Sequence, residues 1–318
     1  MLYLLPIENT RLLALTGILA AFAAAFPVIQ LCQGRLPRDG GRKYAVNGAL
    51  SRGKPRGAGL LMVLVFTACG ILFAPFSAEN LIYLLLTVGA MLSGYLDDAS
   101  ETPWGEYKKG LIDLALALAG AFTYVNFNGS ALQIPFTDIV LALPRWLFIL
   151  LAVVLIWASI NVTNCSDGVD GLSGSLSVVT LSSFLFLCLR TDRSFSLLVG
   201  MLVAVILAYH WFNASPSSLM MGDAGSRALG LFIAFAALKS GSPLLYIPLA
   251  LVLILDGGLG MAKISLKRFL KISILKNIRT PLHDHVRKNK GWSDTQVVFR
   301  FVIMQIALCF AVLAPLLG

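Results

Sequence analysis

Long apolar runs alternate with short polar segments along the whole chain. The eighth apolar run, near 226–240, is short and bounded by Arg227 and Lys239. The ninth, near 243–265, is interrupted by Asp256-Gly257-Gly258, which favours a broken or bent helix. The pattern predicts an all-α, polytopic integral membrane protein with about ten transmembrane helices in a single domain over residues 1–318. The runs that can each supply the ~20 residues of a spanning helix lie near 11–32, 58–76, 79–96, 109–126, 144–163, 172–190, 195–212, 226–240, 243–265 and 299–317.

Composition supports the membrane class. Hydrophobic residues make up 58% of the chain and charged residues 13%, with a mean hydropathy of +0.82. Soluble domains carry about 25% charged residues. The five cysteines lie mostly in apolar runs and form no CxxC pair, so we interpret them as small core residues rather than as disulfides or metal ligands.

Basic residues gather in alternate loops, which predicts the orientation of the chain. All but five of the 25 lysines and arginines lie in or at the edges of one set of loops, near 33–57, 97–108, 164–171, 213–225 and 266–298. The positive-inside rule makes these five loops cytoplasmic and both termini external. The net charge of +9 therefore reflects membrane orientation and does not indicate nucleic-acid binding. The five exceptions are Arg11, Arg145, Arg190, Arg193 and Lys239.

Acidic residues follow the same division. Of the 16 aspartates and glutamates, all but Glu8, Glu79, Asp138 and Asp192 lie in the five loops or at the helix ends that enter them. A transporter needs polar groups along a path through the membrane midplane. Polar chemistry at one face instead favours an enzyme that joins a water-soluble substrate to a lipid head group. We therefore expect the five loops to form the active-site face.

The third loop carries the polar, glycine-rich stretch NVTNCSDGVDGLSG. Asn164, Asp167 and Asp170 are three residues apart, so on a helical path they fall within one ~120° arc. Carboxylates and an amide at the mouth of a membrane helix are costly unless they bind something. The alternative is a solvated loop whose glycines only make turns.

Three further aspartates lie at helix ends that face the same loops. Asp97 and Asp98 are adjacent in YLDDASE and could share a divalent cation, or could simply be exposed where a helix ends. Asp223 lies between two glycines in MGDAGS, where it could bind a metal or cap the following helix. Lys109 could face a phosphate across the same mouth, and Asn213 is a further possible polar contact.

The fifth loop contains two of the three histidines. His283 and His285 are too few for a zinc site unless aspartates join them, but they suit hydrogen bonds to phosphate or sugar. The alternative is a surface pair without a role. In the first loop, Arg52 or Lys54 could contact phosphate. The local G-x-x-x-x-G-K pattern is followed by Pro55, so a nucleotide-binding P-loop is not expected.

These motifs occur in the order found in the polyprenyl-phosphate sugar-1-phosphate transferases. They are DD at the end of the third run, NCSDGVDGL, MGDAGS and PLHDH…GWSDTQVVFRF. The last motif resembles specifically the phospho-N-acetylmuramoyl-pentapeptide transferase branch, and the resemblance covers the third to the tenth run. It implies Mg²⁺-dependent transfer of phospho-MurNAc-pentapeptide from UDP-MurNAc-pentapeptide to undecaprenyl phosphate, giving lipid I and UMP. It also implies a homodimer surrounded by lipids of a bacterial plasma membrane.

The resemblance assigns roles by motif position. Asp97 and Asp98 match an essential pair, with Asp97 the candidate base toward the lipid phosphate, and Asp223 matches the magnesium-binding catalytic aspartate. His283 and His285 match the first and third members of a catalytic histidine triplet. Three departures are the middle histidine, which is Asp284, an aromatic replaced by Met220, and a glycine-rich motif reduced to RGKPRGAG. The implied substrate-binding residues are Lys109, Asn164, Asp167, Asp170, Asn213 and Gly222.

Three other functions stay open. A sibling enzyme that takes UDP-N-acetylhexosamine shares the aspartate loops, although the fifth-loop motif favours the peptide-bearing sugar. An intramembrane prenyltransferase could use the acidic boxes on a prenyl diphosphate but leaves the histidine loop unexplained. A non-enzymatic lipid carrier or flippase is disfavoured by acids gathered on one face.

Overall fold

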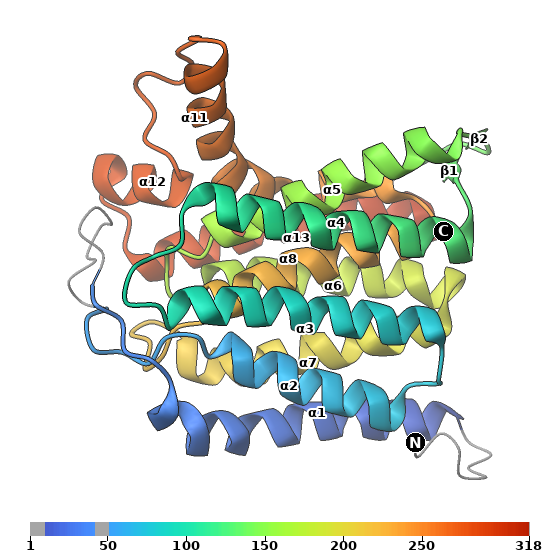
Figure 1. The fold of residues 1–318 in the computed structure, drawn as a ribbon, viewed down its shortest axis with the longest axis horizontal. Coiled ribbons are helices and arrows are strands. Elements are labelled where there is room, and N and C mark those ends of the chain that lie inside the picture. The colour runs from blue at the N-terminus through green and yellow to red at the C-terminus, as the bar shows by residue number, and fades with distance from the viewer. Residues whose placement is uncertain (1–9, 42–50, 318) are drawn as a thin grey trace.

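Long helices running side by side make up the structure, a computed structural model that describes residues 10–41 and 51–317 (Figure 1). Part of the first basic loop and the chain ends, whose external placement is expected, lie outside the described residues. A small antiparallel hairpin, β1 (Ala131–Gln133) with β2 (Val140–Ala142), was not predicted. The helices are α1 (Thr10–Cys32), η2 (Gln33–Arg35), α2 (Gly59–Phe73), α3 (Ala78–Asp98), α4 (Glu106–Asn128), α5 (Arg145–Cys165), α6 (Leu172–Thr191), α7 (Arg193–Asn213), α8 (Gly222–Lys239), η3 (Pro243–Leu245), α9 (Tyr246–Leu249), α10 (Leu251–Leu253), η4 (Ile254–Gly258), α11 (Leu259–Phe269), α12 (Leu282–Lys290) and α13 (Asp294–Leu317).

The all-α membrane fold is confirmed, because a helix or a broken helix covers each predicted run. Among the described residues, 7 helices are long and apolar enough to cross a membrane, and up to 8 if the bent pair is one span. The remaining two are α2, which has 15 residues, and α8, which carries three charged residues. The count of ten spans therefore stays a prediction.

Helix α8 is the central helix of the bundle. Each of its residues except Asp223 is buried, and α3 and α5 pack most extensively against it. At Gly94 of α3, a Cβ atom would overlap the backbone of Asp223, so the glycine allows the two helices to touch. Burial among other helices explains why α8 can carry charged residues although its apolar run is short and bounded by Arg227 and Lys239: its charges face protein and not lipid.

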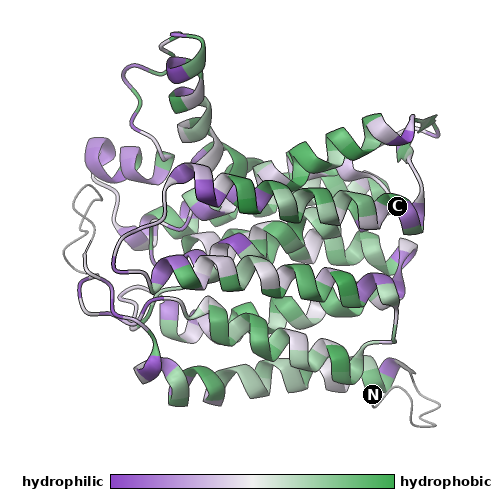
Figure 2. Ribbon diagram, in the orientation of Figure 1, coloured by the Kyte–Doolittle hydropathy of each residue, from purple (hydrophilic) through white to green (hydrophobic). Residues whose placement is uncertain are grey.

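The outer helices present apolar side chains to their surroundings. Leu19 of α1 and Phe310 of α13 are 59% and 75% exposed. Most of the length of the long helices is hydrophobic, and hydrophilic residues concentrate toward the helix ends and the loops (Figure 2). This distribution is typical of a protein whose outer face contacts lipid.

The ninth run is broken, as expected. The segments Pro243–Leu249 and Leu251–Phe269 are bent by 69° at a break between them. The sequence Asp256-Gly257-Gly258 lies a few residues later in the π-helical turn η4, where a Cβ on Gly257 would overlap the carbonyl oxygen of Val162. α11 then projects from the bundle on the side of the predicted cytoplasmic loops (Figure 1).

The first and fourth loops pair with each other through backbone hydrogen bonds. Met220 N donates to Pro55 O at 2.8 Å, and Ala58 N donates to Met220 O at 3.0 Å. Gly171 N, of the third loop, donates to Oδ1 of Asn213 at 2.8 Å. Loops far apart in the sequence thus form one surface at one end of the bundle, as the charge distribution predicted.

Candidate active site

Asp97, Asp98 and Asp223 come together at the end of the bundle that carries the predicted cytoplasmic loops. Asp97 and Asp98 end α3, and Asp223 lies at the second position of α8. Their side chains are 4%, 0% and 15% exposed, so Asp223 is the most accessible of the three. Gly222 has a φ of +71°, and a Cβ there would overlap the Asp98 carboxylate. Glycine at this position therefore allows the start of α8 to lie against Asp98.

Two cations connect these carboxylates. Lys109 Nζ pairs with Asp97 and lies 3.1 Å from Asp223 Oδ2. Arg56 Nε lies 2.8 Å from Asp98 Oδ1, and its Nη2 lies 3.4 Å from Asp223 Oδ1. We call these five side chains the carboxylate cluster. Asp223 is its centre, because both cations contact it.

Arg56 stays charged in this setting. Its burial alone would lower the pKa, but the carboxylates of Asp98, Asp223 and Asp39 outweigh burial and raise the pKa above its ordinary value. Sequence analysis considered Arg52 and Lys54 for phosphate and missed Arg56. The signal that could have found it is its position three residues before the start of α2, next to Gly57 with a φ of +85°.

Lys54 contacts the third and fourth loops instead. Its Nζ lies 3.0 Å from Ser217 Oγ and 3.5 Å from Asp170 Oδ2. Ser217 N also donates to Asp170 Oδ2 at 3.0 Å. Asp170 thereby holds the first and fourth loops together.

The third-loop residues do not share one helical face. α5 ends at Cys165 and α6 begins at Leu172, so Asp167 and Asp170 lie in the turn between them. The expected common arc is wrong, because α5 ends at Cys165, before Asp167, and the chain there follows turns and not a helical path. Asp167 and Asp170 instead line a small cavity of about 30 Å³ together with Asn213 and Met220.

Two predicted substrate-binding amides have protein partners. Asn164 Nδ2 donates to Ser226 Oγ at 2.9 Å, which ties α5 to α8. Asn213 is buried, and its Oδ1 accepts from Gly171 N while its Nδ2 donates to Leu219 O at 2.9 Å. In the structure both amides fix the loops that carry the aspartates.

The histidines are placed by α12. His283 is buried, its Nδ1 lies 2.8 Å from Asp256 Oδ2, and its backbone N donates to Asp256 Oδ1 at 2.8 Å. A Cβ on Gly168 would overlap the His283 ring, so this histidine lies directly against the third loop. His285 Nδ1 accepts from Arg279 N at 3.2 Å. The ring nitrogens of His283 lie 2.8 Å from Asp256 Oδ2 and 3.9 Å from Asp284 Oδ1, and sequence analysis missed the Asp256 partner.

The carboxylate cluster suits a magnesium ion that is bound jointly with a substrate. Among the residues described, no group of three or more His, Cys, Asp or Glu side chains is arranged to hold a metal ion alone. Mg²⁺ usually takes one or two protein carboxylates together with waters and substrate phosphates. Asp223 offers hard oxygen ligands of this kind beside Asp97 and Asp98, so the donor set fits this mode.

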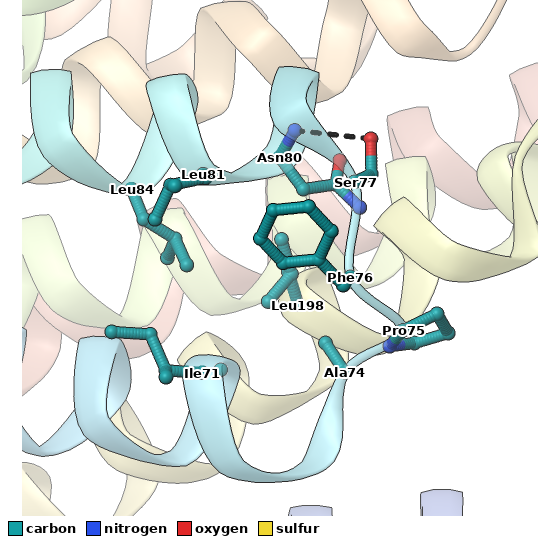
Figure 3. A pocket seen from close by; sticks show the side chains of 10 residues that line it. Ile71, Ala74, Pro75, Phe76, Ser77, Asn80, Leu81, Leu84 and Leu198 are labelled. Carbon is teal, nitrogen blue, oxygen red and sulfur yellow. Dashed lines mark hydrogen bonds between the residues drawn. The ribbon is translucent and has the colours of Figure 1, made fainter. Parts of the chain in front are cut away.

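An apolar groove of about 460 Å³ lies at the other end of α3 (Figure 3). Phe76, Leu81, Leu84 and Leu198 are among its lining residues, and it also includes the α2–α3 connection. Figure 3 shows Asn80 N donating to Ser77 Oγ at the groove's edge. Because α3 separates this groove from Asp97 and Asp98 by most of its length, the groove is not the site of the polar chemistry.

Comparison with known proteins identifies relatives over almost the whole chain. Residues 80–241 match the model of glycosyl transferase family 4. The phospho-N-acetylmuramoyl-pentapeptide-transferase of Treponema pallidum (strain Nichols) is 39% identical over 317 residues, covering 93% of this chain and 87% of the relative. Proteins of the same name from Symbiobacterium thermophilum and Clostridioides difficile are 29% and 27% identical, covering 94% and 98% of this chain and 92% and 98% of their own lengths. The family match includes Asp97, Asp98, Lys109 and Asp223.

Proposed function

The chain belongs to glycosyl transferase family 4, and we propose that it transfers phospho-MurNAc-pentapeptide from UDP-MurNAc-pentapeptide to undecaprenyl phosphate, giving lipid I and UMP. The relatives' names support a phosphotransferase of a bacterial membrane. The observation that carries the proposal is the carboxylate cluster, where Lys109 and Arg56 meet Asp223 at the end of the bundle that carries the basic loops.

The cations of the cluster support binding of a diphosphate. Lys109 and Arg56 each contact Asp223 and one carboxylate of α3. In the proposed complex, both side chains turn toward the diphosphate oxygens of the donor. Asp223 would hold magnesium, assisted by Asp98, and the metal would supply charge neutralisation of the diphosphate.

The reaction needs one bond made and one broken. An oxygen of the lipid phosphate attacks the sugar-bearing phosphorus, and the bond from that phosphorus to the oxygen of UMP breaks. Asp97 accepts the proton that the lipid phosphate still carries, while Lys109 stabilises the charge that develops on the transferred phosphoryl group. Positioning and charge stabilisation supply most of the catalysis.

Direct attack predicts the absence of a covalent phospho-sugar enzyme. Enzyme incubated with the UDP donor but without lipid acceptor should show the mass of the unmodified chain. A mass increase equal to the phospho-sugar, located on Asp97 or Asp98, would replace direct attack by a two-step reaction.

Identification of the lipid product tests the substrate assignment. Purified protein supplied with undecaprenyl phosphate and UDP-MurNAc-pentapeptide should give lipid-linked phospho-MurNAc-pentapeptide. With UDP-N-acetylhexosamine as the donor it should give no lipid-linked product. Use of UDP-N-acetylhexosamine alone would identify the sibling reaction and contradict our interpretation of the histidine loop. Release of pyrophosphate from a prenyl diphosphate would favour the prenyltransferase, and lipid movement across vesicles without conversion would favour a carrier.

A further inference from the structure

A second ion pair lies one helical turn deeper than Lys109 and Asp223. Arg227 of α8 pairs with Asp113 of α4, and their side chains are 2% and 3% exposed. Arg227 Nη2 also lies 3.4 Å from the backbone oxygen of Lys109. Asn161 of α5 donates to the other oxygen of Asp113 at 3.4 Å. This pair is therefore enclosed by protein and is directly connected to Lys109.

The two ion pairs connect the parallel helices α4 and α8 one helical turn apart. We call Lys109–Asp223 the outer rung and Asp113–Arg227 the deeper rung. Lys109 and Asp113 are four residues apart on α4, as are Asp223 and Arg227 on α8, so each set lies on one helix face. Farther along, Lys239 Nζ of α8 lies 2.9 Å from Asn128 Oδ1 of α4. The order of these contacts shows that the helices run in the same direction. The sign of the charge alternates along each helix and is opposite across each rung.

This alternation permits one register between the helices. A shift of one turn in one direction would bring Asp223 beside Asp113, and a shift in the other direction would bring Arg227 beside Lys109. Either shift places like charges together in a medium of low dielectric constant, where repulsion is strong. Buried ion pairs contribute little net stability, but they can specify an arrangement.

We propose that Asp113 and Arg227 are positioning residues that hold Lys109 Nζ between Asp97 and Asp223. The Arg227 contact to the Lys109 backbone fixes the position of the lysine backbone. The deeper rung fixes the register of α4 along α8. The catalytic consequence rests on the proposed function, whereas the position of Lys109 does not. The effect on catalysis and the effect on the position of Lys109 can therefore be measured separately.

The experiment neutralises the deeper rung with Asp113→Asn and Arg227→Gln together, so that no unpaired charge is left buried. An amine-acylating reagent is applied to purified protein, and modification of Lys109 relative to its exposed neighbour Lys108 is followed by mass spectrometry. We expect the ratio to rise about fivefold, because Lys109 is then held less firmly by its carboxylates. We expect kcat to fall about 10- to 100-fold while KM for the UDP donor stays within about threefold.

A matched control neutralises the ion pair at the far end of α8. Glu79→Gln with Lys239→Gln removes a pair whose Nζ–Oε2 distance is 2.9 Å, and should leave the labelling ratio unchanged. An equal rise in this control, or no rise in the test variant, overturns the proposal. If the test variant does not fold, Arg227→Lys replaces it and must itself raise the ratio. Wild-type protein without transferase activity, combined with the expected labelling, would contradict the proposed function but support the positioning role.

Discussion

At the scale of single residues, the carboxylate cluster explains how strong charges can be buried together. The side chain of Asp98 is fully buried, and its Oδ1 lies 2.8 Å from Arg56 Nε. Asp97 pairs with Lys109, and Asp223 is shared by both cations. An unpaired buried charge costs about 3–5 kcal/mol. The cluster is therefore stable only while each group keeps a partner, which a magnesium-bound diphosphate can supply.

Asp223→Asn tests the centre of the cluster. The amide removes the charge that both cations and a metal would share, so we expect kcat to fall at least about 1,000-fold. Thermal unfolding should show that the variant is folded. Asp138→Asn, an exposed aspartate in the hairpin, is the matched control and should keep full activity. Near-normal turnover in Asp223→Asn would remove the metal role from this residue.

Arg56→Gln tests the cation that sequence analysis missed. Loss of the guanidinium leaves buried Asp98 without its partner and removes a contact for the diphosphate. We expect kcat/KM for the UDP donor to fall about 100-fold and the protein to lose about 3 kcal/mol of stability. Arg52→Gln, four residues earlier and exposed, should change either quantity little. The reverse order of effects would assign the phosphate contact to Arg52.

At the scale of elements, α8 is the helix on which the site depends. Its first turn carries Asp223 and its second carries Arg227, and close packing of α3 at Gly94 holds that first turn in place. Van der Waals overlap in such a packed interior shifts the backbone, since few voids are present to absorb it. Catalytic geometry is sensitive to shifts of this size.

Gly94→Ala tests this packing. The new Cβ meets backbone atoms of Asp223 and Ala224, which cannot rotate away, so the start of α8 must move. We expect kcat to fall about 10- to 100-fold in a folded protein. The control is Gly89→Ala on the same helix, where the added Cβ lies 3.3 Å from the flexible tip of Leu116. Equal activity in both variants would show that α3–α8 contact does not position Asp223.

The sequence predicted elements better than it predicted partners. Apolar runs located the helices and indicated that the ninth is broken, because both depend on local composition, but the break lies at Ala250 and not at Asp256-Gly257-Gly258. Arg56, Asp256 and the Asp113–Arg227 pair were missed as partners, since each joins segments far apart in the chain. The arc of Asn164, Asp167 and Asp170 was wrong because a local spacing rule was applied beyond the end of a helix.

At the scale of the whole molecule, the polar chemistry and the apolar groove of Figure 3 lie at opposite ends. The carboxylate cluster joins the C-terminal end of α3 to the start of α8, whereas Phe76 and Leu84 line the groove near the start of α3. The basic loops lie at the same end of the bundle as the cluster. An enzyme that meets a nucleotide donor in water and a lipid acceptor in the membrane needs this polarity. The positive-inside rule predicts that the cluster faces the cytoplasm.

Cysteine labelling tests this orientation. In a variant without the five native cysteines, Lys276→Cys in the fifth loop should react with a membrane-impermeant thiol reagent only after the cells are permeabilised. Asp138→Cys in the hairpin should react in intact cells, since it lies at the opposite end. The inverse pattern would place the carboxylate cluster outside the cell and contradict the proposed orientation.

The most direct test of the account follows UMP release by purified protein supplied with undecaprenyl phosphate and UDP-MurNAc-pentapeptide. We predict steady release with Mg²⁺, loss of release with excess chelator, and recovery when Mg²⁺ is restored. Release that is unaffected by the chelator would contradict magnesium binding at Asp223. Failure of folded protein to release UMP under any of these conditions would contradict the proposed transfer itself.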